Sequence, residues 1–427
     1  MTTAAIENPL SLDRLRWSPT ALRVAVVDEE LPYPLNSGKR IRTLNLLKRL
    51  ASRHRITYIC HRNADADEAR RAERHLLECG IEPVIVERSV PRKSGLGFYA
   101  RLTANLFSPL PYSVATHTSA ALCRAIRDHA ARNHVDIWHC EWTPYAQALR
   151  VLPGARWLVV AHNVESLIWQ RYHETETHPL KRWYMRGQWR KFERFEKWAL
   201  GAAASAVAVS PEDAARMRFN FHVRRVAVVD NGVDTSHFHP AGDARLPGQI
   251  LFLGSLDWRP NLDAVRLLLE RIFPEVRKRE GAARLCIVGR NPPEWLCRET
   301  ASGPGVELHA NPPDVRPFLR ASAVMAVPLR IGGGSRLKIL EALACGLHVV
   351  STRIGAEGLC LVPGRHLDVV DDVDGMAAAL VHCLREPARG ESIAEEGRRV
   401  VVERYDWSVL AEKLERVWFD CVERGAR

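Results

Sequence analysis

Short, almost wholly apolar runs alternate along this chain with segments in which apolar residues recur at helical spacing. A strand inside a parallel sheet is apolar on both faces, because helices cover both sides of the sheet. In the first half the runs are Leu22–Val27, Ile56–Ile59, Pro83–Val86, Val135–Trp138, Trp157–Val160, Ala206–Val209 and Val226–Val229. The pattern predicts a doubly wound α/β domain over residues 21–239.

The same alternation starts again after residues 240–248, whose proline and glycine content is typical of a linker. Further strands are predicted at Ile250–Leu253, Leu285–Val288, Val306–Leu308, Ala323–Val327 and Val349–Ser351, with helices over about 261–280 and 335–345. Ligands of such sheets bind beyond the carboxyl ends of the strands. Two such units in tandem therefore predict a ligand site lined by residues of both units. Residues 1–20 are expected to be an N-terminal tail.

Composition excludes several other classes of protein. The chain has 427 residues, a net charge of +11, 46% hydrophobic residues and 26% charged residues, as in ordinary globular proteins. No secretory signal or membrane-spanning run is visible, so we expect a cytoplasmic protein. The ten cysteines form no C-x-x-C pair, which argues against a zinc site or a disulfide framework. No zinc-finger spacing, RNA-recognition signature or arginine-rich arm points to nucleic acid as a partner.

Residues 180–198 are predicted to form a helix in which seven basic residues and two glutamates are interleaved with aromatic residues. One interpretation is docking on an anionic membrane surface, worth about 1 kcal/mol per basic residue, with a peripheral location at the inner membrane face. The other is an amphipathic helix whose Met185, Trp189, Phe192 and Ala199 face a core while the charged side is solvated. Both interpretations stay open at this point.

The most informative segment runs from the predicted strand at Val327 through Gly332, Gly333, Gly334 and Ser335 into a predicted helix. Adjacent glycines let the backbone approach a ligand closely, and the helix start adds free N–H groups and about half a unit of positive charge. A diphosphate needs more positive charge than that. Arg336 and Lys338 supply it, and Glu341 can accept hydrogen bonds from the hydroxyls of a ribose. The segment predicts a nucleoside diphosphate site, with a plain strand-to-helix connection as the alternative.

Two common phosphate-binding motifs are missing from the sequence. The sequence contains no G-x-x-x-x-G-K-[ST] motif, and the Ser37–Arg40 segment does not match it either. No G-x-G-x-x-G motif follows the first predicted strand. The sequence therefore argues against a P-loop protein and against a dinucleotide oxidoreductase.

Several segments occur in a recognisable order: the Gly38 loop, His162–Ser166, Val207–Ser210, Asp230–Phe238, Phe252–Asn261, the glycine-rich segment and Val349–Gly358. In this order they resemble the retaining glycosyltransferases of the group 1 (family 4) type, over about residues 21–425. The glycine-rich segment resembles a Gly-Gly-Gly-Ser/Thr-Arg-Leu-Lys branch of that family. The resemblance implies a GT-B fold, with two Rossmann-like domains facing each other across a cleft. The domain over 21–239 would bind the acceptor and the domain over 249–405 the nucleotide sugar, while a last helix over 406–427, beginning near Tyr405–Ser408, packs back on the first domain.

The resemblance also implies an activity, the transfer of a sugar from a UDP- or GDP-sugar to a glycan or lipid-linked acceptor. Transfer would proceed with retention of configuration and without a metal or other cofactor. The donor contacts that it implies, together with those predicted above, are Gly38, Arg259, Gly289, Asn311, Gly332, Gly333, Gly334, Ser335 and Glu341. Catalytic roles are assigned to His162, Arg336 and Lys338.

Two parts of the family pattern differ in this sequence. The family has two glutamates eight positions apart, and while the second matches Glu341, the first falls on Gly333. The Arg and Lys that follow the first strand of the second domain in the family fall on Ser255 and Asn261. We infer that Arg259, Arg336 and Lys338 replace their charge.

Two other functions remain open. A GT-B nucleotide-sugar epimerase would need further acid–base carboxylates, and a degenerate, non-catalytic binding protein is favoured only by the glycine at position 333.

Some weaker candidates stand outside these patterns. Asp372–Gly375 resembles part of a calcium loop, but Val370 occupies a ligand position, so helix capping is favoured. His237 and His239 lack a third metal ligand. Glu141 is a candidate for acceptor contact, Glu165 for support of His162, and Leu329 lies near the expected base and sugar positions.

Overall fold

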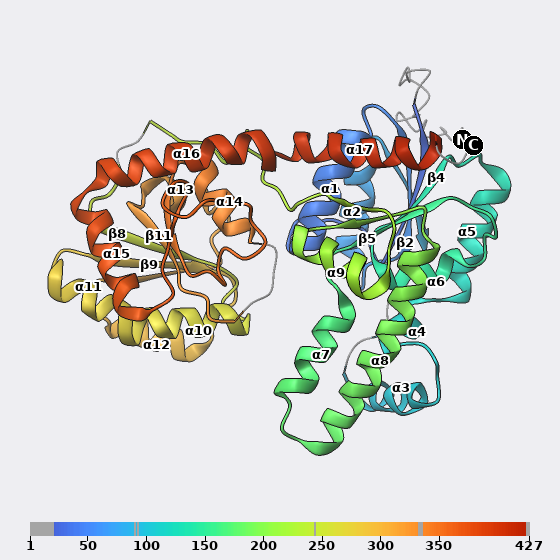
Figure 1. The fold of residues 1–427 in the computed structure, drawn as a ribbon, viewed down its shortest axis with the longest axis horizontal. Coiled ribbons are helices and arrows are strands. Elements are labelled where there is room, and N and C mark those ends of the chain that lie inside the picture. Colours follow the sequence, from blue (N-terminus) through green and yellow to red (C-terminus); the bar gives the residue numbers. More distant parts are fainter. Residues whose placement is uncertain (1–20, 89–90, 92–93, 243–244, 332–335, 424–427) are drawn as a thin grey trace, which may run out of the picture. The chain divides into compact units, whose positions relative to one another are not determined.

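The computed structural model describes residues 21–88, 91, 94–242, 245–331 and 336–423, which fold into two compact units. The first unit ends at Asp230 and includes the chain from Ala411 onward, and the second unit is Asn231–Leu410. Each unit contains one parallel sheet covered by helices (Figure 1).

The sheet of the first unit has the strand order β3-β2-β1-β4-β5-β6-β7, and every neighbouring pair is parallel. The strands are β1 (Arg23–Asp28), β2 (Arg55–His61), β3 (Ile81–Val86), β4 (Ile137–Cys140), β5 (Trp157–Ala161), β6 (Ser205–Ala208) and β7 (Val226–Val228). The strand order reverses between β1 and β4. In folds of this kind, ligands bind beyond the carboxyl ends of the strands at such a point of reversal.

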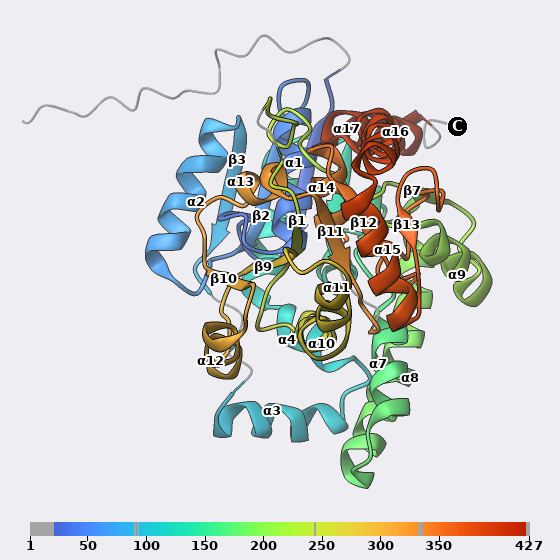
Figure 2. The same ribbon diagram turned by 90° about the vertical axis from the view of Figure 1, so that its left-hand side faces the viewer.

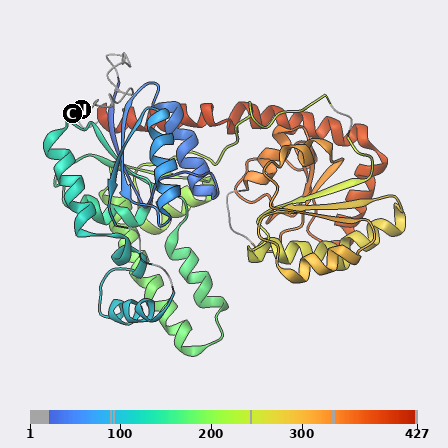
Figure 3. The same cartoon turned by 180° about the vertical axis from the view of Figure 1, so that it is seen from behind.

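The helices of the first unit are α1 (Gly38–Leu50), α2 (Ala66–Glu78), α3 (Leu96–Leu106), α4 (Tyr112–His117), α5 (Ala120–Arg132), the 3-10 turn η2 (Thr143–Tyr145), α6 (Ala146–Leu149), α7 (Glu165–Thr175), α8 (Pro179–Ala202) and α9 (Pro211–Phe221). Gly38 is the first residue of α1, and Ser37 caps the helix by accepting a hydrogen bond from the Arg40 amide at 3.3 Å. Helices α7 and α8 form a hairpin that extends away from the sheet, and α3 lies at the same end of the unit (Figures 1, 2 and 3).

The last helix, α17 (Trp407–Glu423), packs on the first unit with its larger part. Its Trp418 side chain is fully buried there, and the Glu415 carboxylate lies 2.7 Å from His54 Nε2. The Arg156 guanidinium donates to the Val422 carbonyl at 2.8 Å. Trp418 of α17 is thus part of the buried interior of the first unit.

The sheet of the second unit has the order β10-β9-β8-β11-β12-β13, again all parallel. Its elements are β8 (Gln249–Leu253), α10 (Arg259–Leu267), the π turn η3 (Leu268–Ile272), α11 (Phe273–Arg279), β9 (Arg284–Gly289), α12 (Glu294–Ser302), β10 (Val306–Ala310), α13 (Arg316–Ala321), β11 (Val324–Val327), α14 (Leu337–Ala344), β12 (His348–Ser351), β13 (Asp368–Val369), α15 (Val373–Arg385) and α16 (Pro387–Tyr405). The apolar runs predicted as strands therefore form strands in both units.

Two expectations about the second unit need correction. The helix predicted over 261–280 is interrupted by the π turn, because Pro274 has no amide hydrogen for a regular helical bond. Residues 231–239 and the described part of the predicted linker 240–248 belong to the second unit. Arg245 holds this segment by donating to the carbonyls of Ser322 at 2.8 Å and Gly346 at 2.6 Å.

Three further observations concern motifs and composition. Asp372 caps α15 by accepting from the Gly375 amide at 2.6 Å, which confirms the capping interpretation of this motif. The ten cysteines, all within the described residues, form no disulfide bond. Within the described residues, no helix is both long and apolar enough to cross a membrane.

Candidate functional site

In the second unit, polar side chains gather around Lys338 at the carboxyl end of β8. The Lys338 ammonium donates to Asn261 Oδ1 at 2.8 Å and lies 4.9 Å from the centre of the Phe252 ring. Gly254 makes room for it, because a Cβ at this position would lie 2.7 Å from Lys338 Nζ and 2.8 Å from Asn261 Nδ2. The glycine thus lets a cationic group lie directly against the backbone at the end of the strand.

Lys338 and Glu341 are partly buried, and Glu357 is exposed. Burial lowers the pKa of Lys338 to about 7, and the nearby Arg336 adds to the effect while Glu341 opposes it. Burial also raises the pKa of Glu341 to about 7, although the Lys338 charge opposes this shift. The Arg336 guanidinium, with 7% of its side chain exposed, lies 3.2 Å from the Glu357 carboxylate. Two cations and two carboxylates are therefore concentrated at the start of α14.

Two predicted donor contacts, Gly289 and Asn311, have a structural role in the loops at this edge. A Cβ at Gly289 would lie 1.9 Å from the Gly254 carbonyl oxygen, so the close approach of β8 and β9 requires glycine there. Asn311 adopts a positive φ of 52° and donates its amide to the Gly289 carbonyl at 2.8 Å. Its side-chain oxygen accepts from the Asn291 amide at 2.9 Å. Both residues shape the loops, a role that their spacing in the sequence did not reveal.

The remaining predicted donor residues of the second unit are less informative. Arg259 is exposed at the first position of α10, and within the described parts of the chain it makes no hydrogen bond or ion pair. Gly332, Gly333, Gly334 and Ser335 lie outside the described residues.

In the first unit, Glu141 is the centre of a buried polar cluster at the carboxyl ends of β4 and β5. Its Oε2 lies 2.6 Å from His139 Nε2, and its Oε1 lies 2.7 Å from Thr43 Oγ1 and 3.2 Å from His162 Nε2. Burial alone would raise the pKa of Glu141, but the interactions with His139 and His162 outweigh it and hold this pKa well below its ordinary value. Glu141 is therefore a buried carboxylate that carries a negative charge.

A second group of charges lies beside Glu141. The Lys39 ammonium, next to Gly38, is 2.6 Å from Asp28 Oδ1 at the end of β1 and 5.1 Å from the centre of the Trp142 ring. Trp142 in turn donates to Glu165 Oε1 at 2.9 Å. The carboxylate that lies 3.2 Å from His162 Nε2 is that of Glu141, a contact that the sequence did not predict.

Among the described residues, one group of His, Asp and Cys side chains is close enough together to be considered as a metal site. It consists of His348, Asp368 and Cys383, whose ligand atoms lie within 4.8 Å of one another. Arg389 already binds both oxygens of Asp368, at 2.8 Å and 3.0 Å. His348 uses one ring nitrogen for Asp368 at 3.2 Å and the other for Cys383 at 3.4 Å. This arrangement fits a packing contact between β12, β13 and the helices better than a metal site.

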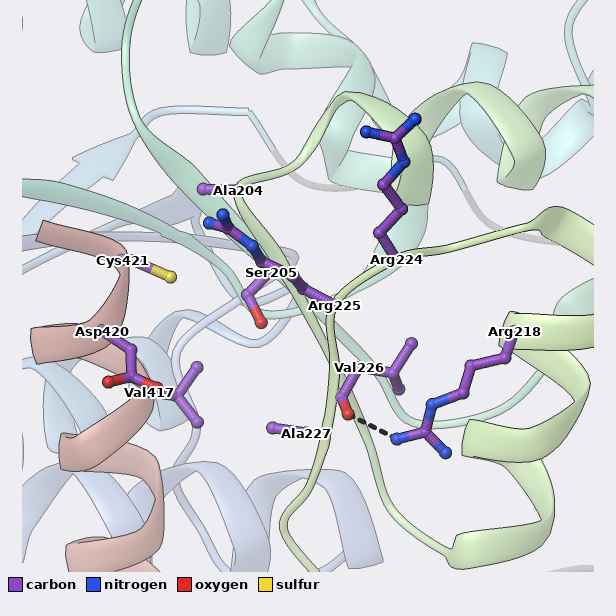
Figure 4. A pocket seen from close by; sticks show the side chains of 10 residues that line it. All are labelled: Ala204, Ser205, Arg218, Arg224, Arg225, Val226, Ala227, Val417, Asp420 and Cys421. Atoms are coloured by element: carbon purple, nitrogen blue, oxygen red, sulfur yellow. Dashed lines mark hydrogen bonds between the residues drawn. The ribbon is translucent and has the colours of Figure 1, made fainter. Parts of the chain in front are cut away.

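A pocket of about 210 Å³ opens at the other edge of the first sheet, where β6 and β7 begin (Figure 4). It is lined by three arginines, Arg218, Arg224 and Arg225, and by Asp420 of α17. Arg218 donates to the Val226 carbonyl at 2.8 Å, and Figure 4 shows Arg224 pointing away from the other lining residues. The pocket lies at the amino edge, away from the Glu141 cluster.

The fold is shared with solved glycosyltransferase structures. A sucrose-phosphate synthase from Thermosynechococcus elongatus superimposes with a TM-score of 0.68 at 18% identity, over 93% of this chain and 98% of that one. Anabaena HepE in complex with UDP gives a TM-score of 0.66 at 12% identity, over 93% of this chain and all of that one (100%). WaaG, a glycosyltransferase involved in lipopolysaccharide biosynthesis, gives 0.59 at 15% identity, over 92% and 99% of the two chains. These likenesses confirm the expected GT-B fold.

Sequence comparisons define the family. Residues 37–237 match the model of the Glycosyltransferase Family 4 domain, and residues 247–386 match that of Glycosyl transferases group 1. Each unit therefore matches a glycosyltransferase domain model, the first unit that of family 4 and the second unit that of group 1.

Curated relatives match over part of their length. A GDP-mannose-dependent alpha-(1-6)-phosphatidylinositol monomannoside mannosyltransferase from Mycolicibacterium smegmatis is 31% identical over 207 residues, 43% of this chain and 53% of that protein. A phosphatidyl-myo-inositol mannosyltransferase of the same organism is 32% identical over 201 residues, which are 44% of this chain and 50% of that protein. The chain spans about half the length of these relatives.

Proposed function

We propose that this protein is a glycosyltransferase that moves a sugar from a nucleoside diphosphate sugar to a glycan or lipid-linked acceptor. The observation that carries the proposal is the position of Lys338. Where the family has a lysine, this sequence has Asn261, and the Lys338 ammonium lies 2.8 Å from the Asn261 side chain. This contact supports the proposal that Lys338 supplies the charge of the family's lysine, although it comes from a different helix.

The cluster around Lys338 has the chemistry of a diphosphate site. An ammonium group whose burial disfavours its charge gains more from an anionic ligand than a solvated one does. Lys338 binds the diphosphate and stabilises the negative charge that develops on the leaving nucleotide, which is the main catalytic contribution in such a site. Glu341, one turn further along α14, accepts hydrogen bonds from the ribose hydroxyls, and Arg336 adds positive charge.

A thermal-shift panel of UDP-, GDP- and ADP-sugars tests donor binding and identifies the base. A nucleotide sugar well above its dissociation constant should raise the melting temperature of the wild type, while Lys338→Met should abolish the rise. Because HepE is described in complex with UDP-glucose and one relative uses GDP-mannose, these two donors are the first probes. A melting temperature that no nucleotide sugar changes would overturn the proposal.

Turnover is tested with the donor that binds. A transferase releases nucleoside diphosphate slowly without an acceptor, a scaffold releases none, and an epimerase converts the donor to a second nucleotide sugar. We propose transfer with retention and without a metal. The anomeric configuration of the product, determined by NMR, and full activity in the presence of EDTA test these two points. His162→Ala should reduce turnover far more than nucleotide affinity, and equal losses in both would contradict its catalytic role.

We further propose that the acceptor is reached at an anionic membrane surface, with the protein bound peripherally at the inner membrane face. The supporting observation is an exposed apolar surface formed by α3 and the α7–α8 hairpin, which lie at one end of the first unit (Figures 2 and 3). Its most exposed residues are Leu96 (90%), Phe107 (89%), Leu180 (73%), Tyr99 (65%) and Trp183 (63%). So much exposed apolar surface in one region is typical of a binding surface.

Charge favours an anionic lipid surface as the partner. Arg182, Arg186, Arg190 and Arg194 recur at every fourth position, so they follow one another along α8, and all four are exposed. The other interpretation of this helix holds for its second half, where Phe192 and Ala199 are buried in the core of the unit. The helix therefore combines exposed arginines along much of its length with exposed apolar residues in its first half and core packing in its second half.

Co-sedimentation with vesicles of phosphatidylcholine, with and without phosphatidylglycerol, tests the membrane proposal. The triple variant Arg186→Glu, Arg190→Glu, Arg194→Glu should lose binding to the anionic vesicles. The matched control changes the same number of arginines at the opposite sheet edge, Arg218, Arg224 and Arg225, and should sediment as the wild type does. Equal sedimentation of both triple variants would refute the proposed surface.

A further inference from the structure

We infer that Glu141 is a positioning residue for His162, and that a hydrogen bond from Trp418 of α17 fixes the tautomer of His139 so that this ring donates its Nε2–H to Glu141. The role of His162 in catalysis rests on the proposed function. The chain of contacts from Trp418 to His162 lies wholly within the first unit, so its existence can be tested apart from any activity.

The direction of the first hydrogen bond in this chain of contacts is fixed by its donor. An indole N–H only donates hydrogen bonds, and Trp418 Nε1 lies 3.1 Å from His139 Nδ1. His139 Nδ1 must therefore be the acceptor and carry no proton. The neutral His139 ring then has its proton on Nε2, and this N–H donates to Glu141 Oε2 at 2.6 Å.

The other oxygen of Glu141 faces His162. Thr43 donates its hydroxyl to Oε1 at 2.7 Å, and His162 Nε2 lies 3.2 Å from the same atom. Because His139 is neutral in this arrangement, the charge of the carboxylate is left to act on His162. It favours a proton on His162 Nε2, which leaves Nδ1 as the ring nitrogen that can receive or hold a second proton.

The hydrogen-bonded side chains of this chain of contacts are buried away from solvent. His139 and Trp418 are fully buried (0% exposed), and Glu141 is 2% exposed. Arg42 and Lys39, both from α1, also interact with Glu141 through their charges. Removal of one member would leave a buried polar partner without its hydrogen bond, so the ring of His162 would lose its fixed orientation rather than gain a new one.

In this arrangement α17 has a role beyond packing. α17 supplies no side chain to His162 itself, yet its tryptophan sets the tautomer of the histidine behind Glu141. A change at Trp418 is therefore expected to reach His162 through three intervening contacts.

The test uses long-range ¹H–¹⁵N spectra of the histidine rings in the full-length protein, together with steady-state kinetics. In the wild type, His139 should show the Nε2–H tautomer alone, and His162 should carry its proton on Nε2. Glu141→Gln should let His162 populate both tautomers, and Trp418→Phe should do the same for His139. Both variants should lower kcat about 100-fold, the size expected for a misplaced reacting group, while the KM for the donor changes little.

A matched control is available on the same helix. Glu415 contacts the buried His54 at 2.7 Å and anchors α17 without joining the chain to His162. Glu415→Gln should leave the ring signals of His162 and kcat unchanged. If Glu141→Gln does not fold, Trp418→Phe, which removes the indole N–H together with part of the ring system, tests the chain from its other end.

The readouts separate the two possible failures. His162 ring signals that are identical in the wild type and both variants, or His139 protonated on Nδ1, would refute the inference. Absence of transferase activity together with the expected tautomers would leave the chain established and refute the proposed function instead.

Discussion

Replacement of Lys338 by arginine should remove the pH dependence of donor binding. The pKa of Lys338 is lowered to about 7 and that of Glu341 is raised to about 7, in both cases mainly through burial. As the pH rises through this value, Lys338 loses its positive charge and Glu341 gains a negative one. The net charge of the pair then falls from +1 to −1, at the place where we propose that the diphosphate binds.

The size of the effect follows from proton linkage. A bound diphosphate restores the charge of Lys338 and raises its pKa towards the ordinary value of about 10.4. Binding therefore takes up a proton when the pH is above 7, so affinity is full below this pH and decreases above it. The expected loss is about tenfold per pH unit between about pH 7 and pH 9. Arginine stays charged throughout this range and also favours the ionised form of Glu341 at lower pH, so the slope should disappear.

Isothermal titration calorimetry with UDP-glucose or GDP-mannose measures the slope directly. A nucleotide sugar is the right probe, because its diphosphate has no free terminal phosphate that titrates in this range. Calorimetry in buffers of different ionisation enthalpy also counts the proton that is taken up. A wild-type affinity that does not change with pH, or an equal slope in Lys338→Arg, would refute the assignment of Lys338 to the diphosphate.

Three further substitutions give simple outcomes. Gly289→Ala should destabilise the second unit by about 1–3 kcal/mol in urea denaturation, because the new Cβ would lie 1.9 Å from the Gly254 carbonyl oxygen. Gly254→Ala meets only the ends of side chains, with Lys338 Nζ at 2.7 Å, so calorimetry should show weaker donor binding with little change in stability, and a large loss of stability would argue against this distinction. Asp372→Ala removes the cap of α15 and should cost about 1 kcal/mol of stability with donor affinity unchanged, whereas a response to calcium in the wild type would contradict the capping role.

The sheet architecture of both units could be predicted because it depends on local composition. Runs such as Val24–Val27 and Leu285–Val288 are apolar at every position, which only a strand buried on both faces requires. The interrupted helix after α10 was missed because the apolar spacing continues through it, and only Pro274 signals the change. The two-residue strand β13 (Asp368–Val369) has no apolar run of its own and forms by pairing with β12.

The polar cluster of the first unit could be predicted in part. His162 and Glu141 both follow predicted strands, so their presence at one sheet edge was expected. Their pairing was not, because it depends on the order of the strands in space: β4 and β5 are neighbours, and their ends bring these side chains within 3.2 Å. The contribution of Trp418 could not be found from the sequence at all, since 279 positions separate it from His139. A buried tryptophan on an amphipathic helix carries no sequence signal for its N–H partner.

The position of Lys338 explains why the spacing of motifs along the chain did not reveal which cation lies beside Asn261. Helix α10 follows β8, helix α14 follows β11, and these two strands are hydrogen-bonded neighbours in the sheet. Side chains near the starts of the two helices therefore reach the same point at the carboxyl edge, as the 2.8 Å contact between Lys338 and Asn261 demonstrates. A cationic side chain from either helix can therefore occupy the same position in space, provided that the end of the strand leaves room for it. Gly254 provides that room. A glycine after β8 together with a lysine in the first turn of α14 is therefore a more specific signature of the proposed diphosphate site than either residue alone.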